Sequence, residues 1–509
     1  MVWTTTYKIP QSIAILAVAG TMLGMDISSM SIFLGSEYFN RYFNYPGPVI
    51  QGLMTGANPV GGLIGCVLFG ILTERIGRVT TFQVVALIWI LGSVISAMVL
   101  NVTMLIVGRL VRGIAVGTLS VLLPVYIGEV IPSNKKGAAT SIVQLALTLA
   151  ILVTFFTCFL LNFLENQISF RVAWGLEMIP ALVFFLLSFC LSESPRWLVA
   201  HGQYDRAQDI LQHFAQGKVS NANITKIDIL EMYGTNQRTG YWDLLSKPLL
   251  KYTLIGVTVQ VLVQACGINI LMFYIVYICE MIGLKGTSKL SAASVPYLIN
   301  VVFTCIPILT LDRLRRKLVI VHGGISLACT MTLIGIMMGC LGHKVPPVNG
   351  NSTIVWEVTG TPGLIVLALC FLFVAIFAST LSCCAWLYTN EVLPARAKSK
   401  GMALCMATSW FLNSCLTFTT PLLLSKIKWI TFVLLGVVTI ILSTIIAIWF
   451  PETREKKELE PQPDEVTSKN SNEDTSEVEK ETRSAAPSPY IHEMNKIELI
   501  AEQGYQETV

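Results

Sequence analysis

Two side chains of opposite charge lie inside apolar stretches of this chain, where charge is rare. Asp26 is the only charged residue between residues 11 and 31, and Arg109 lies within a later apolar run. A carboxylate at the centre of a membrane helix costs about 2.5–3.5 kcal/mol on insertion scales, so it needs a partner or a function. Arg109 is the natural partner. If the pair separates during a working cycle, Asp26 alternates between holding and releasing a proton; the alternative is a static ion pair that braces two helices.

Amide side chains form a second group of candidates in otherwise apolar stretches. Asn and Gln both donate and accept hydrogen bonds, so a set of them suits an uncharged ligand that carries hydroxyl groups. For any single membrane amide, a hydrogen bond between helices is an equally good explanation. Tyr274 and Trp386 add aromatic faces against which a ring can stack. The candidate amides are Gln144, Gln264, Asn269, Asn300 and Asn413.

The elements that must position these residues are indicated by two charged phrases that each occur twice. The phrase Tyr-x-x-Glu-Val-x-Pro-x-x-x-Lys runs from Tyr126 to Lys136 and again from Tyr388 to Lys398. A second phrase, from Glu74 to Arg78, returns in altered form from Asp312 to Arg316. Each copy ends a long apolar run. The duplication predicts two similar helix bundles around one midplane cavity, which is how secondary transporters are built.

The composition is that of a membrane protein. Hydrophobic residues make up 53% of the chain and charged residues 13%, about half of the usual charged share of ~25%. Runs of about 20 apolar residues are long enough to cross ~30 Å of hydrocarbon as helices, and open sheets are excluded because their edges would leave backbone groups unpaired in lipid. We expect an all-α membrane protein with about twelve transmembrane helices in two pseudo-symmetric six-helix bundles. The expected spans are 11–31, 48–71, 79–100, 103–128, 138–161, 172–191, 252–280, 292–311, 318–341, 363–387, 402–425 and 428–450.

Polar segments divide the chain into four expected parts. These are an N-terminal bundle (1–191), a cytosolic linker with short helices (192–251), a C-terminal bundle (252–450) and a disordered cytosolic tail (451–509). The tail could take regulatory modifications and partners, although such tails are often simply solvated. Lys and Arg concentrate in alternate loops, which predicts that those loops and both termini are cytosolic. The basic residues are too localised to suggest nucleic acid.

The repeated charges lie at the expected cytosolic mouth of the two bundles. Ion pairs across this mouth could act as a gate, since each exposed pair contributes ~0–1 kcal/mol and a network of several can bias a conformational equilibrium. The alternative is that basic loops only fix topology, but topology needs no carboxylates. The candidate gate residues are Glu74, Arg75, Arg78, Glu129, Lys136, Glu193, Arg196, Asp312, Arg313, Arg316, Glu391 and Lys398.

These phrases resemble the signature motifs of the sugar-porter family of the major facilitator superfamily. Gly108-Arg109, with the phrase from Pro124 to Gly137, resembles that family's fourth-helix signature. The segment from Glu193 to Leu198 resembles its PESPRWL motif, with Ser192 where proline is usual, and Pro451-Glu-Thr matches the end of its twelfth helix. The segments around Asp26 and from Cys266 to Tyr277 are similar to those of fungal high-affinity glucose/proton symporters.

The resemblance implies import of a monosaccharide with a proton by alternating access, across the plasma membrane. The sugar would be glucose or a related hexose or pentose. It implies that Asp26 and Arg109 couple the proton, and that the five amides with Tyr274 and Trp386 bind the sugar. We expect no cofactor, no metal and no enzyme activity, because the five histidines form no metal-spaced cluster and no nucleophile elbow or Gly-rich phosphate loop is present. The expected partners are a sugar, a proton and the lipid bilayer.

Some residues depart from the family pattern and keep other functions open. Val263 stands where the family usually has the first of two glutamines, and Ser382 and Cys383 replace the usual glycine and its neighbour before Trp386. The alternatives are a carrier-like sugar sensor (a transceptor), a facilitative uniporter and a polyol carrier on the same fold. The short tail without repeated motifs argues against the sensor.

Overall fold

The computed structural model describes residues 9–131, 135–164, 166–215, 240–284, 287–345, 356–394 and 397–453. Contacts divide the chain into two units, one of residues 1–193 and 238–453 and one of residues 194–237 and 454–509. Each unit is described by itself. Most of the expected tail and the middle of the expected linker lie outside the described residues.

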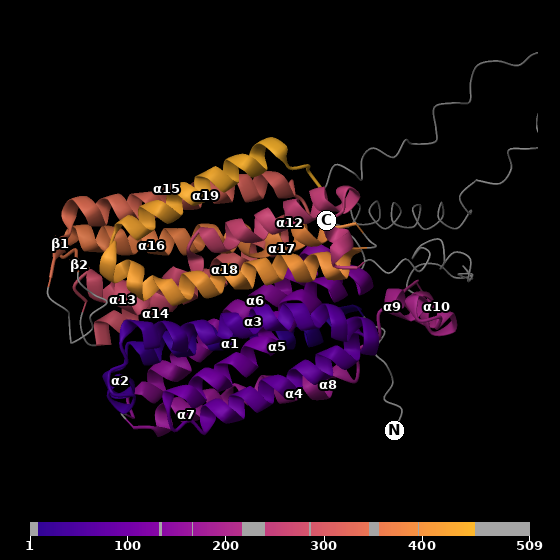
Figure 1. The fold of residues 1–509 in the computed structure, drawn as a ribbon, viewed down its shortest axis with the longest axis horizontal. Helices are drawn as coiled ribbons and strands as arrows, with labels where there is room; N and C mark the ends of the chain where they lie inside the picture. The colour runs from indigo at the N-terminus through magenta and orange to yellow at the C-terminus, as the bar shows by residue number, and fades with distance from the viewer. Residues whose placement is uncertain are drawn as a thin grey trace, which may run out of the picture. The chain divides into compact units, whose positions relative to one another are not determined.

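The first half of the larger unit consists of helices. In Figure 1 these helices run from indigo to purple. They are α1 (Ile9–Leu34), α2 (Glu37–Tyr42), α3 (Pro48–Ile76), α4 (Arg78–Ala97), α5 (Val102–Val130), α6 (Lys136–Asn162), α7 (Ile168–Leu176) and α8 (Met178–Ser188).

The second half of this unit is again helical, apart from one short hairpin. The hairpin pairs β1 (His343–Lys344) with β2 (Trp356–Glu357) in antiparallel register. The helices are η2 (Trp242–Leu245), α12 (Lys247–Ala265), α13 (Ile268–Met281), α14 (Thr287–Thr310), α15 (Arg316–Leu341), α16 (Thr361–Ser379), α17 (Leu381–Val392), α18 (Lys398–Lys426) and α19 (Ile430–Trp449).

The smaller unit is described only over residues 194–215. It contains α9 (Pro195–Ala200) and α10 (Tyr204–Ala215). The Ser194 hydroxyl caps α9 by accepting a hydrogen bond from the Trp197 backbone N–H, which satisfies one of the free donors at a helix start.

Twelve segments of the described residues are long and apolar enough to cross a membrane. Three of the expected continuous helices are interrupted. The sixth breaks into α7 and α8 at Glu177, the seventh into α12 and α13 at Gly267, and the tenth into α16 and α17 at Thr380. Gly267 has φ +89°, a left-handed conformation that glycine adopts without strain. The expected sixth span, 172–191, in fact begins at Ile168 and its helix ends at Ser188.

Small residues allow the helix backbones to approach closely. A Cβ atom at Gly117 of α5 would lie 1.9 Å from the carbonyl oxygen of Gly62 in α3. Close packing of this kind is a main source of helix association in lipid, where the hydrophobic effect cannot bring apolar faces together.

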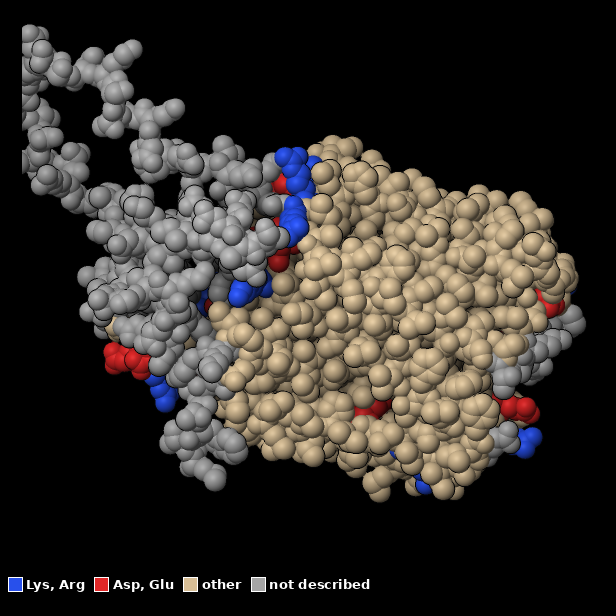
Figure 2. Space-filling view, turned by 180° about the vertical axis from the view of Figure 1, so that it is seen from behind, with Lys and Arg blue, Asp and Glu red and all other residues tan. Residues whose placement is uncertain are grey.

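The two halves contact each other along their lengths. Helix α3 packs against α18, α6 against α14, and α1 against α13, as the neighbouring ribbons of different colour in Figure 1 illustrate. The outward faces carry exposed apolar side chains such as Leu160, Leu309 and Ile448. Figure 2 shows a face almost free of charge, with most Lys, Arg, Asp and Glu gathered toward its ends. A surface of this kind suits lipid on its sides and water at its ends.

Candidate functional site

A buried group of four charges, which we call the charge cluster, surrounds Asp26. Its members are Asp26 of α1, Arg109 and Arg112 of α5, and Glu177 between α7 and α8; each is at most 1% exposed. Arg109 contacts both carboxylate oxygens of Asp26, with Nη2 lying 2.9 Å from Oδ2 and Nη1 lying 3.2 Å from Oδ1. Arg112 Nη2 lies 2.7 Å from Oδ1 of the same carboxylate. Arg112 also pairs with Glu177 through its other terminal nitrogen.

Local helix geometry explains this arrangement. Arg109 and Arg112 are three residues apart on α5, so their side chains leave the same face of the helix. Glu177 lies at the break between α7 and α8, and its backbone carbonyl accepts a hydrogen bond of 3.0 Å from the Trp89 indole of α4. The break therefore holds a carboxylate beside α5.

The structure brings together the two residues that the sequence pairs, and it adds others that sequence reasoning missed. Arg112, Glu177 and Asn58 all belong to the surroundings of Asp26, yet none of them was predicted from the sequence. A signal for Arg112 was present, because it repeats a charge at helical spacing from Arg109. Glu177 was also marked, as an acid inside the sixth apolar run.

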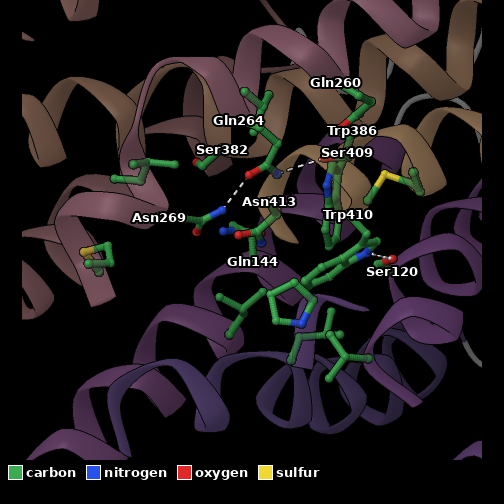
Figure 3. Close-up of a pocket in the computed structure, with 18 of the residues that line it drawn as sticks. Ser120, Gln144, Gln260, Gln264, Asn269, Ser382, Trp386, Ser409, Trp410 and Asn413 are labelled. Carbon is green, nitrogen blue, oxygen red and sulfur yellow. Dashed lines mark hydrogen bonds between the residues drawn. The ribbon is translucent and has the colours of Figure 1, made fainter. Parts of the chain in front are cut away.

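A cavity of about 160 Å³ lies between the two halves. Its lining comes from both halves and includes all five predicted amides and Trp386. Figure 3 shows Gln264, Asn269, Asn413 and Gln144 around the same space, with Trp386 and Trp410 along one side. Five amides from five different helices therefore converge on one cavity. Unrelated hydrogen bonds between pairs of helices would not require this convergence.

Gln264 is the centre of a hydrogen-bonded chain on the cavity wall. Its Oε1 accepts a bond of 2.6 Å from Asn269 Nδ2, and its Nε2 donates over 2.8 Å to the Ser409 hydroxyl (Figure 3). The amide oxygens of Asn300 and Gln260 are buried without a partner among the described residues. Because a buried, unpaired acceptor is costly, these two atoms are suited to a hydroxyl donor from a ligand.

The cavity residues that were not anticipated from the sequence include Gln260, Ser409 and Trp410. Gln260 precedes Gln264 by one helical turn, and Ser409 precedes Asn413 by the same spacing, so helical periodicity could have found them. The Trp410 indole donates over 2.9 Å to the Ser120 hydroxyl of α5 and so joins the two halves.

Tyr274 is placed differently from the expectation. It is 1% exposed and is absent from the cavity lining. Its hydroxyl donates over 3.0 Å to the Thr417 carbonyl and lies 3.2 Å from the Thr55 hydroxyl of α3. The physical reason is a kink in α13, where Tyr274 itself has non-helical φ −112° and ψ 17°. In this conformation Tyr274 ties α13 to α3 instead of facing the cavity.

Asn58 of α3 joins the cavity to the charge cluster. It lines the cavity, and its Nδ2 donates over 2.7 Å to Oδ2 of Asp26. Its own Oδ1 is buried without a partner among the described residues. A ligand that engages this oxygen would therefore be one side chain away from the Asp26 carboxylate.

Two of the departures from the family pattern also lie on the cavity wall. Val263 and Ser382 both line it. The Ser382 hydroxyl is engaged by its own helix, since it donates over 2.7 Å to the Ala378 carbonyl. Val263 supplies an apolar surface at a position where an amide would have offered a further hydrogen bond.

The repeated phrases make matching contacts in the two halves. Arg78 donates two bonds of 3.0 Å to Glu129, and Arg316 Nε lies 3.7 Å from Glu391. The Tyr126 hydroxyl donates over 2.6 Å to the Ser192 carbonyl.

The second half repeats the remaining contacts. The Tyr388 hydroxyl donates over 2.7 Å to the Pro451 carbonyl. In each half, the residue that follows this carbonyl group is an acid that accepts a hydrogen bond from a backbone N–H. Glu193 follows Ser192 and accepts from Arg78 over 2.9 Å, and Glu452 follows Pro451 and accepts from Lys317 over 3.2 Å. We call the region of the larger unit that carries these duplicated contacts the basic end.

Two ion pairs at the basic end each lie within a single half. Ion pairs were expected to face across the mouth, but Arg78–Glu129 and Arg316–Glu391 each join helices of the same half. The reason is that each repeated arginine begins a helix beside the end of its own half's acidic phrase.

Other contacts at the basic end do cross between the halves. Lys400 pairs with Glu74 at 3.1 Å. Arg78 Nη2 donates over 3.3 Å to the Ser399 hydroxyl, and Asp312 accepts over 3.1 Å from the Ala138 N–H.

The other candidate gate residues are scattered over the same region or belong to the smaller unit. Arg75 and Arg313 are exposed. Lys136 and Lys398 are the first residues of α6 and α18, at matching positions. Arg196 lies in α9 of the smaller unit.

Tyr241 adds an aromatic contact at the basic end. The Lys400 ammonium lies 5.7 Å from the centre of its ring. Burial, with the nearby Glu74 carboxylate, raises the pKa of Tyr241 to about 12, so this phenol stays neutral at physiological pH.

Contacts between the halves also lie on the opposite side of the cavity. The Tyr277 hydroxyl donates over 3.1 Å to Gln51 Oε1 near the start of α3. Lys289 pairs with Glu280 and donates over 3.4 Å to the Gly35 carbonyl. The cavity thus lies between two sets of contacts that join the halves.

Comparisons with known proteins agree with this geometry. The family model described as Sugar (and other) transporter matches residues 12–463. The chain is 38% identical to the "Probable metabolite transport protein YFL040W" of Saccharomyces cerevisiae, over 89% of this chain and 85% of that one. It is 34% identical to "High-affinity glucose transporter 1" of Candida albicans, over 87% and 83% of the two chains.

Solved structures show the same fold. A proton:xylose symporter, XylE, bound to 6-bromo-6-deoxy-D-glucose has a TM-score of 0.72 at 22% identity and covers 87% of this chain and 96% of its own. The xylose transporter XylE from E. coli in a partially occluded inward-open conformation has a TM-score of 0.70 at 22% identity, over 88% and 99%. The matched relatives are transporters, not enzymes. The chain therefore belongs to the sugar transporter family of the major facilitator superfamily, as a multi-pass membrane protein with twelve candidate transmembrane segments among the described residues.

Proposed function

We propose that this protein imports a monosaccharide together with a proton by alternating access. The observation that carries the proposal is that Asn58 belongs to both parts of the site: it lines the amide cavity and hydrogen-bonds the only acid of α1. A sugar in the cavity and a proton on Asp26 would therefore act on the same side chain, which gives the two ligands a direct route of coupling.

The cavity suits one sugar ring. Its volume of about 160 Å³ is below the ~300–1,000 Å³ of pockets that enclose drug-sized ligands. Amides supply both donors and acceptors for ring hydroxyls, and Trp386 and Trp410 supply aromatic surface. The names of the relatives, a glucose transporter and an arabinose-proton symporter among them, support a hexose or pentose as substrate.

We further propose that the protein resides in the plasma membrane with both termini in the cytosol. The basic end would then be the cytosolic mouth, because positively charged loops stay on that side of a membrane. The contacts at the basic end would act as the cytosolic gate, and those around Tyr277 and Lys289 would close the cavity toward the outside.

The test is uptake of labelled glucose, xylose and glycerol by cells that lack their own carriers, with the pH of the medium recorded. The native chain is expected to accumulate a sugar and to raise the external pH. Asp26→Asn is expected to lose accumulation, because an amide cannot take up and release the coupled proton. Glu37→Gln, at an exposed acid of α2, is the matched control and should behave as the native chain.

Two other results would contradict the proposal. Sugar uptake that only equilibrates, with no change in external pH, would indicate a uniporter. Correctly localised protein that moves none of the three compounds while sugar-responsive genes still change expression would indicate a sensor.

Facilitative uniport is the second candidate function, and one observation favours it. Asp26 contacts two guanidinium groups instead of one. Two cations favour the ionised carboxylate, and an acid that never takes up a proton cannot couple transport to it.

A further inference from the structure

The charge cluster contains a second arginine, Arg112, that the proposed coupling of Asp26 does not require. Arg112 is fully buried and lies one helical turn from Arg109. It contacts Asp26 at 2.7 Å on one side and Glu177 on the other. A buried arginine is costly unless its charge is compensated, so its placement between two acids is the feature to explain.

Charge balance gives the explanation. With Asp26 and Glu177 both ionised, the charge cluster holds two cations (Arg109 and Arg112) and two anions (Asp26 and Glu177), and its net charge is zero. A proton on Asp26 would leave a net positive charge away from water. Without Arg112 the same proton would instead neutralise a net negative charge. Arg112 therefore reverses which state of Asp26 is electrically balanced.

We propose that Arg112 is a positioning residue that keeps Asp26 ionised in this conformation. On this proposal Asp26 takes up a proton only when Arg112 withdraws from it and pairs with Glu177 alone. Arg112 would thus set the acidity at which the carrier loads its proton. The inference rests on the proposed function, because it concerns the proton step of that function.

No other charged side chain on the helices packed against α1 offers an alternative explanation within the described residues. On α6 the one charged residue is Lys136, at its first position, and α8 has none. The charged residues of α3, Glu74 and Arg75, lie in its last turn.

The remaining helices add only distant or neutral groups. The charged residue of α13, Glu280, pairs with Lys289. The nearby phenol of Tyr274 bonds Thr55 and Thr417. Helix α2 carries the exposed pair Glu37 and Arg41, and α7 carries Arg171, which donates to the Val99 carbonyl. These contributions leave Arg109 and Arg112 as the cations in contact with Asp26.

The test is the protonation midpoint of Asp26 in the purified full-length protein, measured by infrared difference spectroscopy. Protonation produces the carbonyl stretch of a carboxylic acid, and the part of this band that disappears in Asp26→Asn is assigned to Asp26. The double variant Arg112→Gln/Glu177→Gln removes one cation and one anion. The charges of Asp26 and Arg109 therefore still compensate each other, and no unpaired buried charge is left to destabilise the fold. We expect its Asp26 midpoint to rise by about one pH unit or more, because an adjacent Arg opposes protonation by ~1–3 units.

Two further variants separate this role from a purely structural one. Glu177→Gln releases Arg112 from its second partner, so the Asp26 midpoint should fall below that of the native chain. Arg112→Lys keeps the cation and should leave the midpoint near the native value. Removing Arg112 should raise the Asp26 midpoint, and removing Glu177 should lower it. A loss of packing is not expected to shift the midpoint in opposite directions in these two cases.

The proposal fails if the Asp26 midpoint is the same in the native chain and the double variant, or if Asp26 stays ionised in both over the accessible pH range. Uptake measured in parallel separates this failure from that of the proposed function. Equal midpoints with intact proton-coupled uptake overturn only the inference about Arg112. The expected order of midpoints in a chain that moves no sugar supports the inference and contradicts the proposed function.

Discussion

At the scale of single residues, the cavity depends on Gln264, which uses both ends of its amide. Because Gln264 accepts from Asn269 and donates to Ser409, its orientation and that of Asn269 are fixed together. We expect Gln264→Ala and Asn269→Ala each to raise the KM for sugar about tenfold, equivalent to ~1.4 kcal/mol. Labelled-sugar uptake over a concentration series measures this.

The double variant distinguishes a shared role from two independent ones. Since the two amides hold each other in place, the loss in the double variant should be clearly smaller than the sum of the two single losses. Fully additive losses would show that each amide contributes separately. Thr258→Ala is the control, because Thr258 lies on the same helix as Gln264 and its hydroxyl donates to the Leu254 carbonyl of that helix.

The sequence predicted much of this site because polar residues are rare in apolar runs. Each predicted amide stood out by type alone, and all five line the cavity. Arg112 and Asn58 were missed although they too are polar residues in apolar runs, because only distances between helices show that they contact Asp26. Tyr274 was predicted to line the cavity, but a kink in α13 turns it away, and the sequence of α13 does not mark this kink.

At the scale of elements, the break between α12 and α13 is sensitive to a small change at Gly267. Gly267→Ala would place a Cβ atom 2.8 Å from Met331 Cε and 3.1 Å from Leu435 Cδ1, at φ +89°. Left-handed backbone costs a non-glycine residue roughly 1–2 kcal/mol. We expect a lower thermal unfolding midpoint of the purified protein and slower sugar uptake.

A matched substitution tests whether this effect comes from the break itself. Gly47 also precedes a helix, but a Cβ atom there would meet no atom within 4 Å and its φ is −65°. Gly47→Ala should therefore leave both thermal unfolding and uptake unchanged. A Gly267→Ala protein as stable and as active as the Gly47→Ala protein would refute the expectation.

Helices were more predictable than their interruptions. Long apolar runs identify membrane spans because lipid offers the backbone no hydrogen-bond partners. At the break beside Glu177 there is a contact between helices, the bond from the Trp89 indole to the Glu177 carbonyl. Such contacts do not change the hydropathy of the run, so no pattern in the sequence places them.

At the scale of the whole molecule, the pair of Glu74 and Lys400 joins the two halves at the basic end. The pair is partly exposed, and such pairs contribute ~0–1 kcal/mol. We expect Lys400→Glu to change the uptake rate by no more than about fivefold, because it replaces an attraction by a repulsion between like charges. The swap Glu74→Lys/Lys400→Glu should restore most of the native rate.

Rescue by the swap is the informative result, since either single change could act through surface charge alone. Arg75→Glu, at the exposed neighbour of Glu74, is the control: combined with Lys400→Glu it should give no rescue. If the swap is as slow as Lys400→Glu, the pair does not contribute to closing the basic end. The duplication predicted where such contacts gather but not which of them cross between the halves.

If Asp26 couples a proton as proposed, the balanced charge cluster also has an electrical consequence for the transport cycle. With Asp26 ionised, the cluster carries no net charge, so its movement during the return of the empty carrier would be insensitive to the membrane voltage. With Asp26 protonated it carries one positive charge, on which a potential of 100 mV acts with about 2.3 kcal/mol if the charge crosses the whole field. The voltage would therefore drive the loaded half of the cycle, and the inward current should saturate where the return of the empty carrier limits turnover.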